Sequence, residues 1–304
     1  MSTITLDSAN TQLIIQLLNH MKTQDIVNRI STFKSLTPSI TPIEELRKNF
    51  AAALPVFLVL HGDIMTSRKE FYRIRKHAEF ILTKYDDFWC PPQKDISVGR
   101  LNVQNQQILY LSLDPITPFH EANIEPGDYF TFMYYKYKTE AKISALFLEG
   151  LPDESELILR KNGINDKGFL NYTILCDFLK GEMIKPVGKG TEYIYIVTNL
   201  IKEYLDPSQT EQGYLYSSVK DFARRNLAVK QNIAKSLLDC TGSIHGRFIE
   251  YRDNGTKVTM SIFGRCSQII TPDEKIKCEE VFWRNFSFSM SEADKMGGGF
   301  VIAG

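Results

Sequence analysis

The chain lacks several features that would assign it to a class of protein at once. It has no formal net charge, because 36 lysines and arginines balance 36 aspartates and glutamates. A neutral balance gives no general attraction to nucleic acid or to anionic membranes, so we expect neither as a direct partner. No apolar run approaches the roughly 20 residues of a membrane helix, and the longest, 51–60, contains Pro55. No basic segment precedes an apolar one at the start, so no secretory signal is expected.

Cysteine and histidine are scarce and scattered. The five cysteines are odd in number, widely spaced and free of any Cys-x-x-Cys pair. This pattern favours reduced thiols and a cytoplasmic protein over a disulfide framework. The five histidines show no zinc-ligand spacing, so we expect no metal.

Hydrophobic periodicity predicts a mixture of helices and strands. Thr41 is expected to cap a helix that starts at Pro42, and Asp114 to cap a short helix through Glu121. Regular alternation of strand and helix is too rare for a doubly wound parallel sheet, so the fold class is α+β. The other expected helices lie within 8–34, 170–181 and 193–205, and the expected strands cover 71–75, 108–111, 129–138, 143–148, 214–216, 227–229, 247–251 and 258–263.

Three groups of short motifs stand out when the whole chain is considered. They are Phe-Tyr-Arg-Ile-Arg at 71–75; Gly-Arg-Leu-Asn at 99–102, Leu-Tyr-Leu-Ser at 109–112 and Glu121; and Gly-Tyr-Leu-Tyr-Ser-Ser at 213–218 with Asn-Leu-Ala-Val at 226–229. Their order and spacing resemble those of the RES-domain family, which is named for an arginine, a glutamate and a serine. The resemblance covers residues 69–232, a little over half of the chain.

The resemblance implies a fold like that of ADP-ribosyltransferases, with mixed, mainly antiparallel sheets and flanking helices. It divides the chain into an N-terminal helical extension (1–65), an NAD-binding catalytic domain (66–235) and a C-terminal extension with strands packed on the same body (236–304). The extensions are candidates for a lid, a homo-oligomer interface or a partner surface.

The resemblance also assigns roles to individual residues. It implies that Arg73, Glu121, Ser217 and Ser218 are catalytic, and one sequence does not decide which of the two serines matches the family serine. The residues that it implies for binding NAD are Arg73, Arg100, Asn102, Tyr110, Ser217 and Ser218.

These residue types suit the cleavage of NAD at its nicotinamide–ribose bond. Guanidinium groups such as those of Arg73 and Arg100 bind phosphate oxygens bidentately. Breaking the bond builds positive charge on the ribose, as glycoside hydrolysis does, and the carboxylate of Glu121 could stabilise it. A serine hydroxyl could bond the pyrophosphate, and Tyr110 offers a face for nicotinamide.

Simpler explanations compete with each assignment. Arg73 could lie on a solvated strand face, and Arg100 could be a loop arginine bound to a carbonyl. Glu121 could be an exposed residue near a helix end, and Ser217 and Ser218, followed by Asp221, could be a strand end and a helix cap. Tyr110 could be a core residue. Beside Glu121, His120 could instead assist at the site. The sequence also departs from the family at 103–107, where Asn105 can supply the turn in a left-handed conformation.

The leading hypothesis is therefore an NAD glycohydrolase or phosphorylase, with water or phosphate as the acceptor. The family's members often act as growth-arresting toxins, so the resemblance implies an antitoxin protein as a partner. One alternative is a mono-ADP-ribosyltransferase that modifies a protein target. The other is a non-catalytic nucleotide-binding or interaction module.

Overall fold

The chain forms two compact units, each built from three separate stretches of the sequence. The computed structural model describes residues 3–6, 11–65, 70–78, 82, 84–139, 141–150, 152–221, 224–267, 269–271, 276 and 279–289. Unit 1 comprises 1–64, 97–104 and 144–219, and unit 2 comprises 65–96, 105–143 and 220–304. The three-part division predicted from the sequence stays a prediction.

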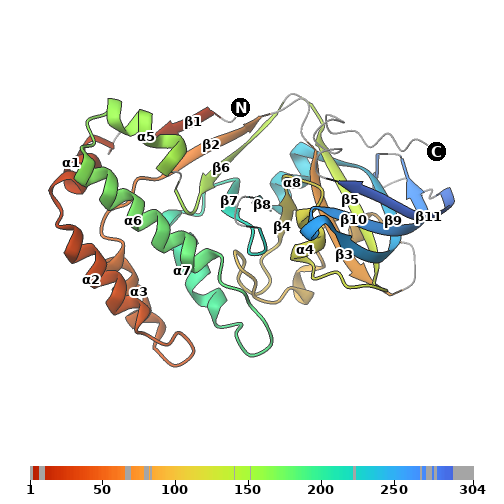
Figure 1. The fold of residues 1–304 in the computed structure, drawn as a ribbon, viewed down its shortest axis with the longest axis horizontal. Helices are drawn as coiled ribbons and strands as arrows, with labels where there is room; N and C mark the ends of the chain where they lie inside the picture. Colours follow the sequence, from red (N-terminus) through yellow and green to blue (C-terminus); the bar gives the residue numbers. More distant parts are fainter. Residues whose placement is uncertain are drawn as a thin grey trace. The chain divides into compact units, whose positions relative to one another are not determined.

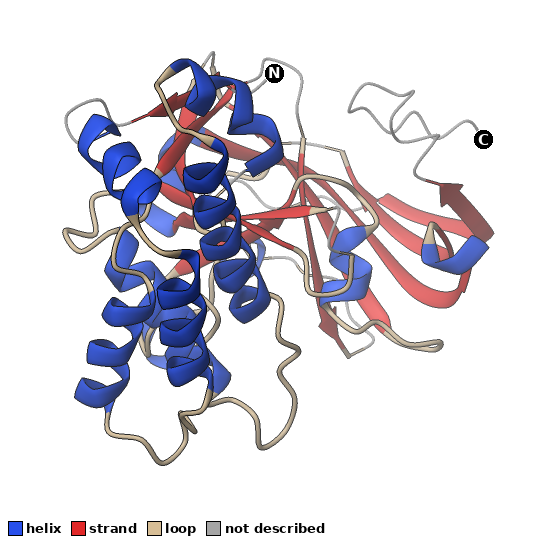
Figure 2. Cartoon of the chain, turned by 60° about the vertical axis from the view of Figure 1, so that its left-hand side comes forward, coloured by secondary structure: helices blue, strands red, loops and turns tan. Residues whose placement is uncertain are grey.

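Unit 1 is built on a layer of helices (Figures 1 and 2). Helix α6 packs against four of the other helices of the unit, α1, α2, α5 and α7. Aromatic rings fill the contacts, with Phe33 and Phe50 at 5.5 Å and Phe33 and Phe178 at 5.6 Å. The helices are α1 (Thr11–His20), α2 (Thr23–Lys34), α3 (Ile43–Ala53), α5 (Pro152–Lys161), α6 (Asp166–Met183) and α7 (Ile194–Leu205).

The expected helices are confirmed in unit 1, but the expected cap of α3 is wrong. Pro42 occupies the N-cap position, and no side chain caps the helix there. Thr41 instead closes the preceding turn, where its N–H donates to the Thr37 carbonyl at 2.9 Å. The proline restricts Thr41 to a non-helical conformation, so the helix begins one residue later than expected.

The strands of unit 1 follow the order β1-β2-β6-β7. They are β1 (Thr3–Leu6), β2 (Leu60–Met65), β6 (Lys142–Phe147) and β7 (Gly213–Ser217). β1 and β2 are antiparallel, whereas β6 and β7 are parallel. All five residues of β7 are buried, as expected of a strand covered on both faces.

The strands of unit 2 follow the order β8-β4-β3-β5-β9-β10-β11. Its recorded strand pairs are all antiparallel. The strands are β3 (Phe71–His77), β4 (Ile108–Ser112), β5 (Tyr129–Tyr137), β8 (Arg225–Lys230), β9 (Leu238–Arg252), β10 (Lys257–Cys266) and β11 (Glu279–Ser289), joined by α4 (Thr117–Glu121), α8 (Gln231–Leu237) and 3-10 turns at Tyr85–Phe88, Gln93–Asp95 and Asp253–Gly255.

The centre of this sheet has two different faces. Tyr72 and Ile74 belong to a buried cluster that also contains Phe119 of α4 and Phe132 of β5. We call this side the helix face. Because side chains alternate along a strand, the residues between them project to the opposite side, which we call the arginine face. It carries Arg73, Arg75 and His77 of β3.

The chain is thus mixed α/β, with mostly antiparallel strands and flanking helices. All the strands expected from the sequence are present, although β9 is much longer than the expected 247–251. The sequence did not predict β1, β2, α5, α8 or β11. The sequence also predicts that the tail from Asp294 is flexible or an edge strand, and this tail lies outside the described residues. No helix in the described part is long and apolar enough to cross a membrane.

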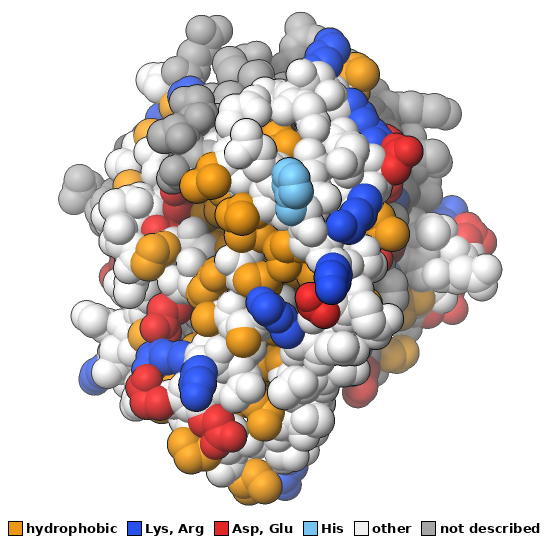
Figure 3. Space-filling view, turned by 90° about the vertical axis from the view of Figure 1, so that its left-hand side faces the viewer, with side chains coloured by type: hydrophobic (Ala, Val, Ile, Leu, Met, Phe, Trp, Pro, Cys, Tyr) orange, Lys and Arg blue, Asp and Glu red, His pale blue; other side chains and the backbone are white. Residues whose placement is uncertain are grey.

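Unit 1 leaves several large apolar side chains exposed on its helices. Figure 3 faces the side of Figure 1 on which α1 and α2 lie, and it shows hydrophobic side chains gathered among basic and acidic ones. Exposed apolar residues of these helices include Leu13 and Leu17 on α1, Val27 on α2 and Leu170 on α6.

Candidate functional site

Glu121 ends α4 and is held by a chain of polar side chains. Its Oε1 accepts a hydrogen bond from the Asn226 amide at 2.9 Å, and the Asn226 Oδ1 accepts from the Ser112 hydroxyl at 2.8 Å. Asn226 and Ser112 are buried and lie opposite each other on β8 and β4. The carboxylate of Glu121 therefore has a fixed position beside this strand pair.

The short helix that carries Glu121 is fixed in turn by Asp114. The Oδ1 of Asp114 accepts from the N–H groups of Ile116 and Thr117 at 3.0 and 2.9 Å, and its Oδ2 accepts from the Thr117 hydroxyl at 2.6 Å. Asp114 thus accepts N–H groups at the start of the helix, but the predicted N-cap position is wrong, because Ile116 occupies it. The helix itself begins at Thr117, two residues later than expected.

Tyr110 lies on the same side of the sheet as Glu121. Ser112 pairs with Tyr72, so both project from the helix face, and Tyr110 is two residues before Ser112 on the same strand. Its ring is half-buried. Three of the family-like segments, those of Tyr110, Glu121 and Asn226, thus meet on the helix face of unit 2.

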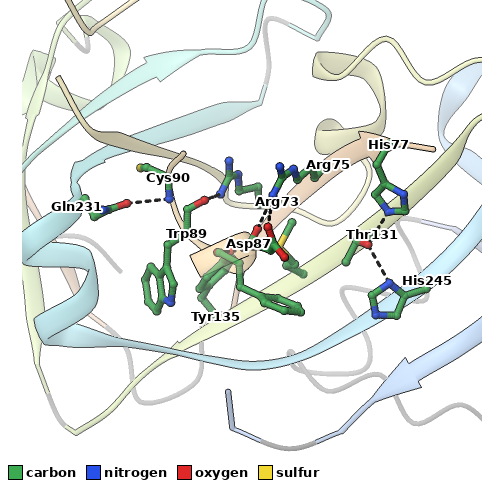
Figure 4. A network of polar contacts seen from close by, with 12 residues as sticks. Arg73, Arg75, His77, Asp87, Trp89, Cys90, Thr131, Tyr135, Gln231 and His245 are labelled. Atoms are coloured by element: carbon green, nitrogen blue, oxygen red, sulfur yellow. Dashed lines mark hydrogen bonds and ion pairs between the residues drawn. The ribbon is translucent and has the colours of Figure 1, made fainter. Parts of the chain in front are cut away.

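Arg73 projects from the opposite side. It shares the arginine face with Met133, its partner on β5, and its Nη1 donates to the Trp89 carbonyl at 2.7 Å (Figure 4). Arg75 lies two residues on and forms an ion pair with Asp87 at 3.3 Å. The structure therefore does not bring Arg73 and Glu121 together.

A buried polar network, which the sequence did not predict, extends along the arginine face. The Thr131 hydroxyl lies 2.7 Å from Nε2 of His77 and 2.8 Å from Nδ1 of His245 (Figure 4). Thr131 and His245 are fully buried. Burial lowers the pKa of His245 to about 4, with a smaller effect from nearby His77, so His245 is neutral at pH 7.

The guanidinium of Arg100 binds backbone carbonyls within unit 1. Its Nη1 donates to the carbonyl of Met183 and its Nη2 to that of Lys185 at 3.0 Å, at the C-terminal end of α6. The group also lies over the ring of Tyr195 at 6.0 Å. These contacts agree with the simpler explanation, in which Arg100 is a loop arginine bound to carbonyls.

Asn102 likewise stabilises its own loop. Its amide donates to the carbonyls of Ser97 at 2.8 Å and Val103 at 3.1 Å. Asn105 has a φ of 65°, so the left-handed turn predicted there is confirmed. The segment 99–102 is a loop held in place by hydrogen bonds from its neighbours in unit 1.

Ser217 ends β7 in unit 1 and Ser218 follows it, and Ser217 has an unpredicted partner. Its hydroxyl donates to Oε2 of Glu149 at 2.6 Å, and its N–H donates to Oε1 at 2.8 Å. Glu149 and both serines are buried. Glu149 lies two residues after the end of β6, and the parallel pairing of β6 with β7 explains why it meets Ser217. A polar residue directly after a buried apolar strand was the only signal for it in the sequence.

A cavity of about 370 Å³ opens beside α4, and all its lining residues belong to unit 2. His120 lines it, next in sequence to Glu121. The lining residues are Asp114, Ile116, Thr117, His120, Lys220, Asp221, Arg224, Asn254, Gly255 and Thr256.

The predicted site residues are thus divided between the units. Unit 2 holds Arg73, Tyr110 and Glu121, whereas unit 1 holds the other four. Within the described residues, no group of three or more His, Cys, Asp or Glu side chains is placed to hold a metal ion. Comparison with models of protein families, with curated proteins and with solved structures found no match.

Proposed function

We propose that the protein cleaves NAD at the nicotinamide–ribose bond, with Glu121 as the carboxylate that stabilises the transition state. The observation that carries the proposal is the hydrogen bond from Asn226 to Glu121 at 2.9 Å, which fixes a carboxylate on the helix face. The resemblance of the motifs to RES-domain proteins supplies the reaction, and with it a fold like that of ADP-ribosyltransferases.

Cleavage of the nicotinamide–ribose bond is favoured by a fixed negative charge near the ribose. As the bond to nicotinamide lengthens, positive charge develops on the ribose ring, and a carboxylate already in position stabilises it without reorganisation. Asn226 holds Glu121 by one oxygen, so it is a positioning residue in this proposal. Tyr110, on the same face, offers an aromatic surface against which nicotinamide can stack.

Arg73 is not part of this proposed site, because it projects from the other face of the sheet. The acceptor is water or phosphate. A growth-arresting role, with an antitoxin as partner, is proposed from the resemblance alone.

The experiment is to follow nicotinamide release from NAD by chromatography, with and without phosphate. Glu121→Gln keeps the size of the side chain and its bond from Asn226 but removes the charge, so we expect the rate to fall about 100-fold. Glu125→Gln is the matched control, since Glu125 is an exposed acid four residues away. Asn226→Ala should lower kcat more than it raises KM, because it displaces the charge rather than removing it.

Full activity of Glu121→Gln would refute the assignment of Glu121. If Glu125→Gln released nicotinamide as slowly as Glu121→Gln, the loss of rate would reflect a general effect of the substitutions on folding. Labelled ADP-ribose on a protein, with no free product, would instead support the alternative of a mono-ADP-ribosyltransferase.

A further inference from the structure

The cavity beside α4 has a lining that suits one class of small molecule. Three segments form it: residues 114–120, residues 220–224 before β8, and the turn at 254–256 between β9 and β10. Its volume of about 370 Å³ lies within the range of ligand sites in proteins. Apart from Ile116, its lining side chains are polar or charged, so the ligand must be polar too.

Arg224 supplies the cavity with available hydrogen-bond donors. Its Nε lies 3.4 Å from Oδ2 of Asp221. Its two terminal nitrogens have no protein partner in the part of the chain that the structure describes. A guanidinium with two open N–H groups matches the geometry of phosphate oxygens. Lys220 adds a second positive charge to the same lining.

The acidic residues of the lining do not cancel this attraction. Asp114 is fully engaged by its own turn, since it accepts two N–H groups and one hydroxyl. Asp221 is exposed, and its negative charge is partly offset by the ion pair with Arg224. A carboxylate in this position accepts hydrogen bonds, so it suits the hydroxyl groups of a ligand.

His120 provides a second, fixed acceptor. Its Nε2 lies 2.9 Å from the Gly255 carbonyl, which can only accept, so Nε2 carries the hydrogen. The ring stacks on Tyr251 with centroids 4.7 Å apart and planes 12° apart. In the neutral ring Nδ1 is then a hydrogen-bond acceptor, and it has no partner among the described residues.

We propose that this cavity binds a small phosphorylated sugar, with Arg224 taking the phosphate and Nδ1 of His120 taking a hydroxyl. The lining pairs donors for an anion with acceptors for hydroxyl groups. The stack on Tyr251 covers one face of the His120 ring and holds the ring in place. The proposal stands on the cavity and does not rest on the cleavage of NAD.

The test is calorimetric titration of the full chain with ribose 5-phosphate, inorganic phosphate and ribose. Ribose 5-phosphate should bind most tightly, because only it carries both a phosphate for Arg224 and hydroxyl groups for His120. Arg224→Gln should weaken it at least tenfold, the equivalent of one charged hydrogen bond of about 1.4 kcal/mol. His120→Phe keeps the stack, so it should weaken ribose 5-phosphate and leave inorganic phosphate unchanged.

Arg75→Gln is the matched control. Arg75 also forms an ion pair with an aspartate, at 3.3 Å, and its side chain is 39% exposed against 34% for Arg224. It projects from the arginine face, away from α4. Such half-exposed pairs contribute little to stability, so both variants should fold.

Three results would overturn the proposal: no binding of ribose 5-phosphate by the folded protein, equal weakening in Arg224→Gln and Arg75→Gln, or ribose binding as tightly as its phosphate. Glu121→Gln should leave binding of ribose 5-phosphate unchanged while it slows the cleavage of NAD about 100-fold. The two proposals therefore fail separately.

Discussion

Ser217→Ala tests whether the Ser217 hydroxyl has a structural role or a chemical one. In the structure the hydroxyl donates to Glu149 at 2.6 Å, and the N–H of the same residue donates to the other carboxylate oxygen at 2.8 Å. Ser217 is 5% exposed and Glu149 is 8% exposed, so water cannot readily replace a lost bond.

The expected loss in the free energy of unfolding follows from these two hydrogen bonds. A hydrogen bond to a buried charged group contributes about 1.5–3 kcal/mol. Ser217→Ala removes one of them, so the free energy of unfolding should fall by about 2 kcal/mol. Glu149→Ala leaves two buried donors without an acceptor and opens a cavity, so the loss should reach about 4 kcal/mol.

The assay is urea denaturation of both single variants and the double variant. The double-mutant cycle should give a coupling of about 2 kcal/mol between the two side chains. Ser35→Ala is the control, because the Ser35 hydroxyl is exposed on unit 1 and bonds only the Thr32 carbonyl. A Ser217→Ala protein as stable as the control, but with slower release of nicotinamide, would refute the structural role.

Three further predictions concern other residues of the two units. Arg100→Ala should lower the free energy of unfolding by about 2 kcal/mol in urea, because two carbonyls at the end of α6 lose a charged donor; an unchanged midpoint would contradict this. His245 has a pKa lowered from 6.5 to about 4, so its contribution to stability is full above pH 6.5 and is lost as the pH falls to about 4. The loss is about 3 kcal/mol, and His245→Gln should remove this part of the pH dependence of unfolding. Gly150→Ala should cost about 3 kcal/mol, since φ is +67° and the new Cβ would lie 2.8 Å from the Tyr172 hydroxyl. Gly163→Ala should cost only about 1 kcal/mol, because φ is +94° but nothing lies within 4 Å; equal thermal shifts would contradict the packing argument.

Periodicity was sufficient to predict the long elements of the fold. Helices α6 and α7 and strands β3, β5 and β10 have clear apolar patterns, and each forms where expected. β1 and β2 lack such a pattern. Leu60–Met65, for example, contains a glycine and polar residues, and it depends on pairing with a partner that is distant in sequence. Pairing is a tertiary effect that a local pattern does not contain.

The candidate site was harder to predict, for two physical reasons. Whether Arg73 faces Glu121 depends on the register of β3, and a shift of one residue moves a side chain to the other face. The partners of Arg100 are remote, because Met183 lies 83 residues away in sequence. Motif order predicted that Glu121 and the Asn226 strand belong together, whereas only the structure shows the amide that joins them.

The most direct test of the central claim is nicotinamide release from NAD by the wild-type chain and by Glu121→Gln, measured on folded protein with Glu125→Gln beside them. The account predicts release by the wild type and the control, and a rate about 100-fold lower for Glu121→Gln. Equal rates in all three proteins, or no release by the folded wild type with either acceptor, would contradict it.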